Sequence, residues 1–523
     1  METAATRSVE TLEEARIHIA DLTAELACLE AERDCFRRMS EELLTKLKLA
    51  NHRSFAPSSE ASDDQLELFN EAEATANESV AEPKVETITY RRRKRIGKRE
   101  ADFSTLEHVR IDYELDKDKR ICPACENPLH DMGSEVRREL TIIPARMYVT
   151  EHAAHKYACR VCDRKAYTTP IIKASAPIPL LPKSIASASL LAHIITNKYT
   201  LSLPLYRQEA DFAAKGIDIS RQNMANWVCA TASALEPVYE HMKSDLLKSE
   251  VLHADETTMQ VLREPDKKAS AKSYMWLYRT GSDATHPLVI YEWQKSRGAP
   301  VPKEFLRAWS GYLHTDGYEA YHKLEHPTIV GCMAHVRRKF DEAYKIVPEE
   351  ERLDSLAAVG LTFCNRLFAL EKTWVDLDPG SRQELRLEKS KPLFDEFVAW
   401  AKSARALPKS APGLAIHYLL SQEPYLRNFY LDGRLELSNN RAERSIKPFI
   451  IGRKNWLFAN TVKGAQASAL LYSLIETAKE NNLKVFDYLC WLFEQLPNTA
   501  PERISDLCPH SGILPEELYV TKR

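Results

Sequence analysis

The chain has 523 residues, which is enough for several domains and a large buried core. Its 72 Lys and Arg nearly balance its 75 Asp and Glu, so the net charge of −3 gives no global sign of nucleic-acid binding, and any DNA contact must come from local patches. No run approaches the roughly 18 apolar residues of a membrane span, and the start lacks the apolar core of a signal peptide. We therefore expect a cytoplasmic protein without membrane contact, in which the thiols are reduced.

Residues 8–50 carry apolar side chains at a seven-residue spacing. One series runs through Leu22, Leu29, Phe36 and Leu43, as in the seam of a coiled coil. The alternative is a single amphipathic helix that packs on its own protein. Because the chain offers no obvious partner helix, we expect this segment to self-associate and to make the protein a homo-oligomer, at least a dimer.

Residues 51–105 lose this periodicity. Their first part is acidic and rich in Ser and Ala, which is typical of a flexible linker. A basic run follows at residues 90–99. A charge run is usually just solvated, but this density beside a linker favours contact with DNA phosphates. The residues expected to make that contact are Arg91, Arg92, Arg93, Lys94 and Arg95.

Residues 106–170 contain two CxxC pairs. They are Cys122-Pro-Ala-Cys125 and Cys159-Arg-Val-Cys162. Paired CxxC motifs place four thiolates where tetrahedral Zn²⁺ needs them, and a closed four-sulfur site is structural rather than catalytic. The sequence therefore predicts a zinc ribbon-like module with one structural Zn²⁺.

Residues 171–245 have the apolar spacing of helices. Helices are expected at residues 184–199 and 205–215, followed by a turn in which Ser220 caps a third helix that begins at Arg221. This pattern resembles a helix-turn-helix that binds DNA. A plain helical lead-in that packs on the next domain is an equally good interpretation.

Residues 246–500 alternate strand and helix patterns and carry two similar acidic motifs. Asp255 follows an apolar, strand-forming run, and Asp316 repeats that design, with Gly317 breaking the strand after the acid. We expect both Asp to end their strands. Further strands are expected at residues 273–279, 288–293 and 328–332, and helices at residues 302–309 and 333–340.

A third acid, Glu443, lies in a predicted helix that Ser438, Asn439 or Asn440 could cap. Two strand-end Asp and one helical Glu make an oxygen-only site, which suits Mg²⁺ or Mn²⁺ and two-metal phosphoryl transfer. Taken one at a time, each acid is more often a helix cap or a surface charge.

Cys332 and His335 make only half of a zinc site. We expect His335 to support catalysis beside the carboxylates or the scissile phosphate, and the alternative is a buried Cys with a capping His. A helical insertion is expected at about 341–434, and residues 501–523 form a tail. DNA contacts near the acids are expected from Arg337, Arg338, Arg441, Arg444, Lys447, Arg453 and Lys454.

The short sequence motifs around the three acids resemble those of a known family. Asp-Glu-Thr, Asp-Gly-Tyr-x-x-Tyr and Asn-Asn-x-Ala-Glu-Arg resemble the transposases of the bacterial insertion-sequence 66 family. The resemblance extends over nearly the whole chain. It implies a DDE-class enzyme whose α/β catalytic core is a ribonuclease H-like mixed sheet with helices. In such a core the first and fourth strands lie side by side, which would bring Asp255 and Asp316 together.

The resemblance also implies the partners and the reaction. The partners would be double-stranded DNA, namely the terminal inverted repeats and the target, and accessory proteins encoded by the same element. The reaction would be metal-dependent strand cleavage and joining of the 3′-OH. The alternatives are a catalytically inactive, zinc-containing DNA-binding regulator descended from a transposase, and a nuclease of the same fold that only hydrolyses.

Overall fold

The computed structural model describes residues 16–30, 32–33, 36, 39–40, 146–158 and 171–520. The chain divides into two compact units, residues 1–56 with 154–523, and residues 57–153. The basic run at residues 91–95 and the four cysteines predicted to bind zinc lie outside the described residues. Within the described part, no helix is long and apolar enough to cross a membrane.

The N-terminal segment is helical over residues 16–30. The apolar side chains of the predicted seam are exposed in this single chain: Leu22 is 50% exposed, Leu29 59% and Phe36 71%. Within the described residues this apolar stripe has no partner, and self-association stays a prediction.

Helices precede the main sheet. They are α6 (Ala188–Tyr199), α7 (Leu205–Ala214), α8 (Arg221–Ala234) and α9 (Glu236–Leu246). The predicted cap is confirmed, since the Ser220 hydroxyl accepts a hydrogen bond from Asn223 N at 3.2 Å. A short antiparallel pair, β1 (Lys156–Ala158) with β2 (Ile171–Lys173), comes before them in the chain.

The main sheet has the strand order β5-β4-β3-β6-β7, and β8 pairs with the far end of β3. Its strands are β3 (Val251–Arg263), β4 (Lys272–Thr280), β5 (Val289–Gln294), β6 (Tyr312–His314), β7 (Thr328–Val330) and β8 (Ala459–Thr461). β3, β4 and β5 are antiparallel, whereas β6 is parallel to both β3 and β7. The expected adjacency of the Asp255 and Asp316 strands is therefore confirmed.

Helical segments cover both edges of this sheet. On β5, the hydroxyls of Ser473 and Thr477 from α18 (Val462–Glu480) accept hydrogen bonds from the backbone N–H groups of Tyr291 and Val289, at 2.7 and 3.0 Å. Beyond β7, the backbone N–H of Gly331 donates to the carbonyl of Tyr425 in α16 (Ala411–Arg427) at 3.0 Å. Side chains and backbone of helices thus occupy positions that a further strand would need.

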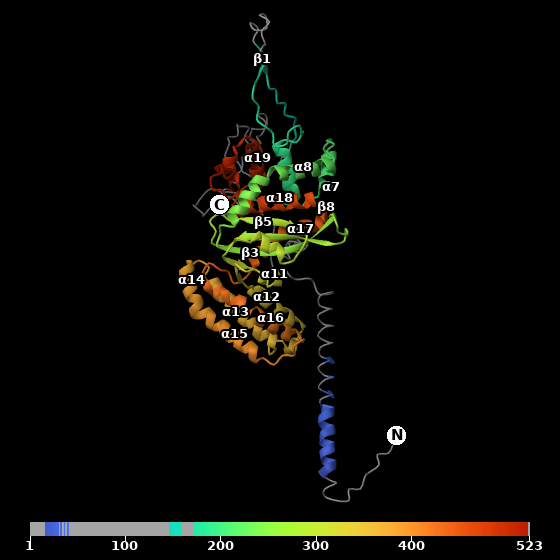
Figure 1. Cartoon of the computed structure of the whole chain (residues 1–523), viewed down its shortest axis with the longest axis vertical. Coiled ribbons are helices and arrows are strands. Elements are labelled where there is room, and N and C mark those ends of the chain that lie inside the picture. The colour runs from blue at the N-terminus through green and yellow to red at the C-terminus, as the bar shows by residue number, and fades with distance from the viewer. Residues whose placement is uncertain are drawn as a thin grey trace, which may run out of the picture. The chain divides into compact units, whose positions relative to one another are not determined.

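The segment predicted as a helical insertion is mainly helical. α12 (Met333–Ile346) leads into α13 (Leu356–Thr373), α14 (Pro379–Leu385), a π-helical turn, α15 (Lys391–Ser403) and α16. These helices pack around Phe340, Phe363 and Phe397. In Figure 1 they lie on the opposite side of the sheet from α8, α18 and α19 (Val485–Gln495). After the insertion, α17 (Asn440–Trp456) returns to the sheet. Short connecting helices α10 (Pro300–Phe305) and α11 (Glu319–His322) flank β6.

Candidate active site

The register of β3 and β6 puts Asp255 and Asp316 at matching positions. His253 pairs with His314 in the parallel ladder, and each Asp lies two residues further along its chain. Side chains two residues apart along a strand lie on the same face, and neighbouring strands are about 4.8 Å apart. The expectation that Asp255 ends its strand was wrong, because β3 continues to Arg263; β6 does end before Asp316.

The pKa of Asp255 indicates that other acids lie close to it. Burial raises the pKa of Asp255 well above its ordinary value, and the negative charges of Glu256, Asp316 and Glu443 raise it further. The backbone N–H of Glu256 donates a hydrogen bond to Asp255 Oδ1 at 2.8 Å. This bond lowers the pKa of Asp255, but it does not cancel the effects that raise it. The structure thus brings the three predicted acids into one electrostatic neighbourhood.

The loop after β6 holds Asp316 in place. Asp316 Oδ1 accepts a hydrogen bond from the backbone N–H of Tyr318 at 2.9 Å, and the Asp316 carbonyl accepts one from the Tyr418 hydroxyl at 2.9 Å. Gly317 has φ +89°, which a residue with a side chain rarely adopts. The strand nevertheless ends at His314, before the acid, so the predicted break at Gly317 was wrong. Tyr418 belongs to α16, and the insertion therefore supports the site.

Glu443 lies in the first turn of α17. Asn439 occupies the predicted cap position, but its side chain forms no cap bond. Instead, Asn439 Nδ2 donates to the carbonyl of Ala254 at 2.9 Å, and Asn439 Oδ1 accepts from His253 Nδ1 at 2.9 Å. Its backbone N–H donates to Cys332 Sγ at 3.1 Å. One residue therefore joins α17, β3 and the start of α12 directly beside Asp255.

A buried histidine pair lies along the strands beside the two Asp. The rings of His253 and His314 are stacked with centroids 4.2 Å apart. Glu436 Oε2 is 3.0 Å from His253 Nε2, and Arg441 donates two hydrogen bonds to Glu436, both at 2.9 Å. Burial raises the pKa of Glu436, but these partners outweigh burial and hold it below its ordinary value. Arg441, predicted to contact DNA, is thus engaged with Glu436.

Sequence reasoning missed this network, although a signal was present. A histidine stands two residues before each predicted Asp, in Leu-His-Ala-Asp and Leu-His-Thr-Asp. The pKa of His314 lies well below its ordinary value because of burial and the nearby His253. A neutral His314 ring can therefore pack in the sheet.

Glu256, next to Asp255, was also missed. Its carboxylate accepts hydrogen bonds from Tyr321 Oη at 2.6 Å and Arg297 Nε at 2.7 Å. The Arg297 guanidinium also lies over the ring of Tyr318, 3.9 Å from its centroid. Burial and the charge of Asp316 raise the pKa of Glu256 despite these partners. The carboxyl group is therefore satisfied by contacts inside the protein.

His335 lies beside Glu443, as predicted for a supporting residue. His335 Nδ1 is 3.7 Å from Glu443 Oε1, and Arg338 Nη2 donates to Glu443 Oε2 at 3.2 Å. Burial and the charge of Arg338 lower the pKa of His335. Cys332 is buried, which raises the pKa of its thiol to about 11. Within the described residues, Cys332, His335 and Glu443 form a group whose potential ligand atoms all lie within 4.8 Å of one another.

The other predicted DNA contacts differ in their surroundings. Arg337 donates to Asn365 Oδ1 at 2.8 Å, and Arg453 donates to Thr258 Oγ1 at 3.0 Å and to Thr257 Oγ1 at 3.3 Å on β3. Arg444 and Lys454 are exposed, and Lys447 is half-buried. DNA contact by these residues stays a prediction.

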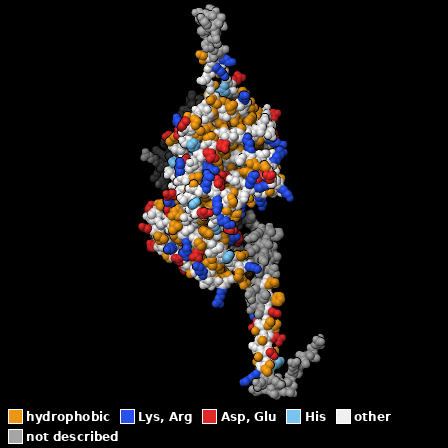
Figure 2. Space-filling model, in the orientation of Figure 1, with side chains coloured by type: hydrophobic (Ala, Val, Ile, Leu, Met, Phe, Trp, Pro, Cys, Tyr) orange, Lys and Arg blue, Asp and Glu red, His pale blue; other side chains and the backbone are white. Residues whose placement is uncertain are grey.

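A basic edge that the sequence analysis missed surrounds β8 and the β3–β4 turn. Lys and Arg side chains gather at this edge in Figure 2. Arg263 pairs with Thr461 of β8, which brings it close to the end of α17 and the start of α18. The exposed Lys and Arg residues in these segments are Arg263, Lys268, Lys272, Lys454 and Lys463.

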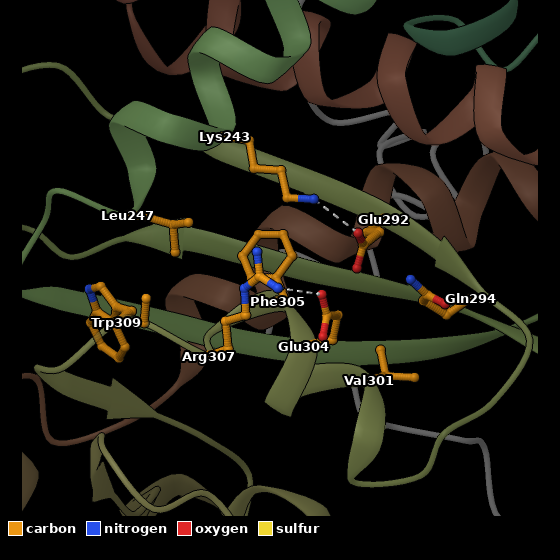
Figure 3. Close-up of a pocket in the computed structure, with 10 residues that line it drawn as sticks. Lys243, Leu247, Glu292, Gln294, Val301, Glu304, Phe305, Arg307 and Trp309 are labelled. Carbon is orange, nitrogen blue, oxygen red and sulfur yellow. Dashed lines mark hydrogen bonds and ion pairs between the residues drawn. The ribbon is translucent and has the colours of Figure 1, made fainter.

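A separate cavity of about 480 Å³ is bounded by α9, β5 and α10 (Figure 3). Its charged side chains pair with one another: Lys243 with Glu292 at 3.3 Å, and Arg307 with Glu304 at 3.4 Å. None of the predicted site residues lines it. The acids around Asp255 are therefore the better candidate for an active site.

Comparison with known families gives matches along most of the chain. The family described as "Transposase IS66 family" matches residues 183–467, more than half of the chain. The "zinc-finger binding domain of transposase IS66" matches residues 119–163, and the "IS66 C-terminal element" matches residues 473–510. The first range contains Asp255, Asp316 and Glu443, and the second contains all four cysteines of the CxxC pairs.

Similar proteins occur in Sinorhizobium fredii. The uncharacterized protein y4qI is 32% identical over 416 residues, which cover 76% of this chain and 73% of the relative. The uncharacterized protein y4hP is 30% identical over 472 residues, which cover 85% of this chain and 82% of the relative.

Proposed function

Because the chain belongs to the IS66 transposase family, we propose that it cuts the ends of its own mobile element and joins them to target DNA. The observation that carries this proposal is the β3–β6 register, which sets Asp255 and Asp316 at matching positions on adjacent strands. Glu443, on a helix joined to β3 through Asn439, supplies the third acid.

The strand order supports a ribonuclease H-like core. Three antiparallel strands, β3 to β5, are followed by β6 and β7, and β6 runs parallel to β3. This is the order that the resemblance implies for such a core. We propose that Asp255, Asp316 and Glu443 are its catalytic acids.

The chemistry of these acids fits divalent cations. Burial and the negative charges of neighbouring carboxylates hold the pKa of Asp255 well above its ordinary value, so a cation placed beside Asp255 would be stabilised. Carboxylate oxygens are the ligands that Mg²⁺ and Mn²⁺ prefer. When bound, two such ions would activate the attacking oxygen and stabilise the leaving oxygen.

The protein's own contribution is to hold these groups in place. Tyr318 and Tyr418 fix Asp316 through the hydrogen bonds described above, and Arg338 orients Glu443. Hydrolysis would break one P–O bond at the element end and leave a 3′-OH. That hydroxyl would then attack a target phosphodiester by in-line displacement, without a covalent enzyme intermediate.

The remaining parts would bind DNA and assemble the complex. The zinc-finger match supports one structural Zn²⁺ at Cys122, Cys125, Cys159 and Cys162. We propose that the α7–α8 pair, the basic edge and the run at residues 91–95 contact DNA phosphates, and that the N-terminal helix joins two or more chains. Accessory proteins from the same element are proposed partners.

The test replaces Asp255→Asn, Asp316→Asn and Glu443→Gln singly in the full-length protein. Each change keeps size but removes a ligand charge, so cleavage and strand transfer on labelled end DNA should fall by on the order of 10³-fold or more, with end binding nearly unchanged. Glu319→Gln, at an exposed acid just beyond Asp316, is the matched control.

The same assay separates the alternatives. Hydrolysis of end DNA without joining would favour a nuclease. Binding of ends without either reaction in the unaltered protein would favour an inactive regulator. An Asp255→Asn variant that still joins DNA would contradict the proposal that these acids are catalytic.

A further inference from the structure

Cys332, His335 and Glu443 bring three potential ligand atoms together where α12 and α17 begin. The Cys332 sulfur, a ring nitrogen of His335 and a carboxylate oxygen of Glu443 all lie within 4.8 Å of one another. His335 Nδ1 and Glu443 Oε1 are 3.7 Å apart. Two donors that bind one tetrahedral Zn²⁺ at about 2.0–2.1 Å are roughly 3.3–3.4 Å apart. The observed gap therefore needs only a small adjustment.

The two atoms that face each other have no hydrogen bond to any part of the chain that the structure describes. His335 Nδ1 and Glu443 Oε1 are both buried. The second oxygen of Glu443, Oε2, accepts from Arg338, and His335 Nε2 lies 3.4 Å from the same guanidinium. Arg338 thus orients both residues from the outside. Buried polar atoms without partners cost free energy, and a cation between them would satisfy both.

The Cys332 sulfur faces backbone amides at the start of α12. Cys332 is the residue before α12. Its sulfur accepts a hydrogen bond from the backbone N–H of Asn439 at 3.1 Å, and the backbone amides of Ala334 and His335 also lower the pKa of the thiol. These amides lower the pKa of the thiol only in part, because burial still holds it at about 11. A metal ion bound here would therefore have to displace the thiol proton.

We propose that Cys332, His335 and Glu443 form a transition-metal site that binds Zn²⁺ and is distinct from the Asp255–Asp316 pair. Thiolate and imidazole ligands select zinc-like ions, whereas oxygen-only ligands suit Mg²⁺. Three protein ligands leave a fourth position for water.

Occupancy of this site would hold Glu443 away from the two Asp. Its Oε1 atom cannot serve both sites, and Arg338 restrains Oε2. Zinc bound here should therefore inhibit the Mg²⁺-dependent reaction. This consequence rests on the function proposed above, whereas the metal site itself does not.

The test titrates Co²⁺ into the full-length protein after a mild chelator has removed zinc from the three-ligand site and left the four-sulfur site filled. Cobalt bound to Cys332 should give a thiolate-to-cobalt charge-transfer band, which an oxygen-only site cannot produce. Cys332→Ser should lose that band, and competition with a chromophoric chelator should show one fewer zinc per chain than in the unaltered protein. Cys229→Ser, at a half-buried thiol on α8, is the matched control and should keep both signals.

Two further variants keep the sulfur in case Cys332→Ser does not fold. His335→Gln and Glu443→Gln should each weaken zinc binding at this site by at least about tenfold. Equal zinc content and equal cobalt spectra in all variants would overturn the site. If cobalt binds through Cys332 but zinc does not inhibit strand transfer, the proposal that bound zinc holds Glu443 away from the two Asp is wrong. A protein without any strand transfer still allows the spectral test.

Discussion

Asn439 is the side chain that most directly connects the parts of the candidate site. Its amide bonds to Ala254 and His253 on β3, and its backbone N–H bonds to Cys332. Asn439 is fully buried. Loss of its amide would therefore leave the Ala254 carbonyl and a histidine nitrogen without partners.

We predict that Asn439→Ala lowers the free energy of unfolding by about 1–3 kcal/mol, because buried polar groups lose their partners. Urea unfolding would measure the change. Asn440→Ala is the control, since the adjacent Asn440 side chain makes no hydrogen bond within the described residues and should change stability much less. Equal effects of the two substitutions would contradict the assigned role of Asn439.

Lys198 is a second residue with a measurable consequence. Its ammonium lies 5.2 Å from the ring centroid of Tyr199 and 5.3 Å from that of Trp456. Burial lowers its pKa from 10.5 to about 8, although nearby Cys229 raises it slightly. Between pH 8 and 10.5 the folded chain thus binds fewer protons than the unfolded chain, so stability due to Lys198 rises with pH across this window.

We predict that Lys198→Met stabilises the protein at pH 7, where the folded state holds a charged ammonium in a partly buried position. The gain should shrink above pH 8 and vanish above about pH 10.4, where the unfolded side chain is also neutral. Urea midpoints at pH 7 and pH 10 test this. Lys268→Met, at an exposed position, should show no such pH-dependent gain. A stability gain of Lys198→Met that grows with pH would contradict the predicted direction of the pH dependence.

Sequence reasoning predicted the three acids but not the residues that hold them. Asp255 and Asp316 follow visible strand-forming runs, and Glu443 follows visible cap residues. In contrast, the bonds of Asn439 and Glu436 to His253 join residues more than 180 positions apart. Such contacts leave no periodicity in the sequence.

At the level of elements, β3 shows why strand ends are difficult to predict. The strand continues past Asp255 because β4 pairs along it and β8 pairs with Val261 and Arg263. Arg453 of α17 also bonds to Thr257 and Thr258 beyond the acid. These partners lie far along the chain. Local composition correctly predicted most strands and helices, but it could not show how long β3 would be.

The α12–α13 contact depends on a glycine. A Cβ atom at Gly360 of α13 would overlap the ring of Phe340 in α12. We predict that Gly360→Ala lowers the free energy of unfolding, because overpacking costs about 1–3 kcal/mol and exceeds the gain of up to about 1 kcal/mol from helix propensity.

Gly464→Ala provides the matched comparison for urea unfolding. Gly464 is also helical, in the first turn of α18, but the nearest atom to its added Cβ would be Thr461 Oγ1 at 3.5 Å. There the substitution should be neutral or stabilising by up to about 1 kcal/mol. If both substitutions destabilise equally, the contact with Phe340 is not the cause.

For the whole molecule, the covered edges of the sheet restrict how chains can associate. Helical groups occupy positions on both β5 and β7, so strand addition at either edge would first have to break these contacts. The exposed seam of the N-terminal helix is then the more favourable surface for self-association.

We predict that deletion of residues 8–50 lowers the oligomeric state, because the seam through Leu22, Leu29, Phe36 and Leu43 is removed. Light scattering coupled to gel filtration would compare the two proteins. A full-length variant with Leu22→Glu and Leu29→Glu should behave like the deletion. An unchanged mass in both would show that the helix packs within its own chain.

The helical insertion between β7 and α17 also delays the synthesis of α17 relative to β3 and β6. A ribosome that adds about 5–20 residues per second needs roughly 10–40 s to go from Asp255 to Glu443, about 190 residues later. During that interval the nascent chain can form β3 and β6, but α17, with Asn439 at its start, has not been made. A chain that terminates within the insertion would likewise carry the paired Asp without the helix that completes their surroundings.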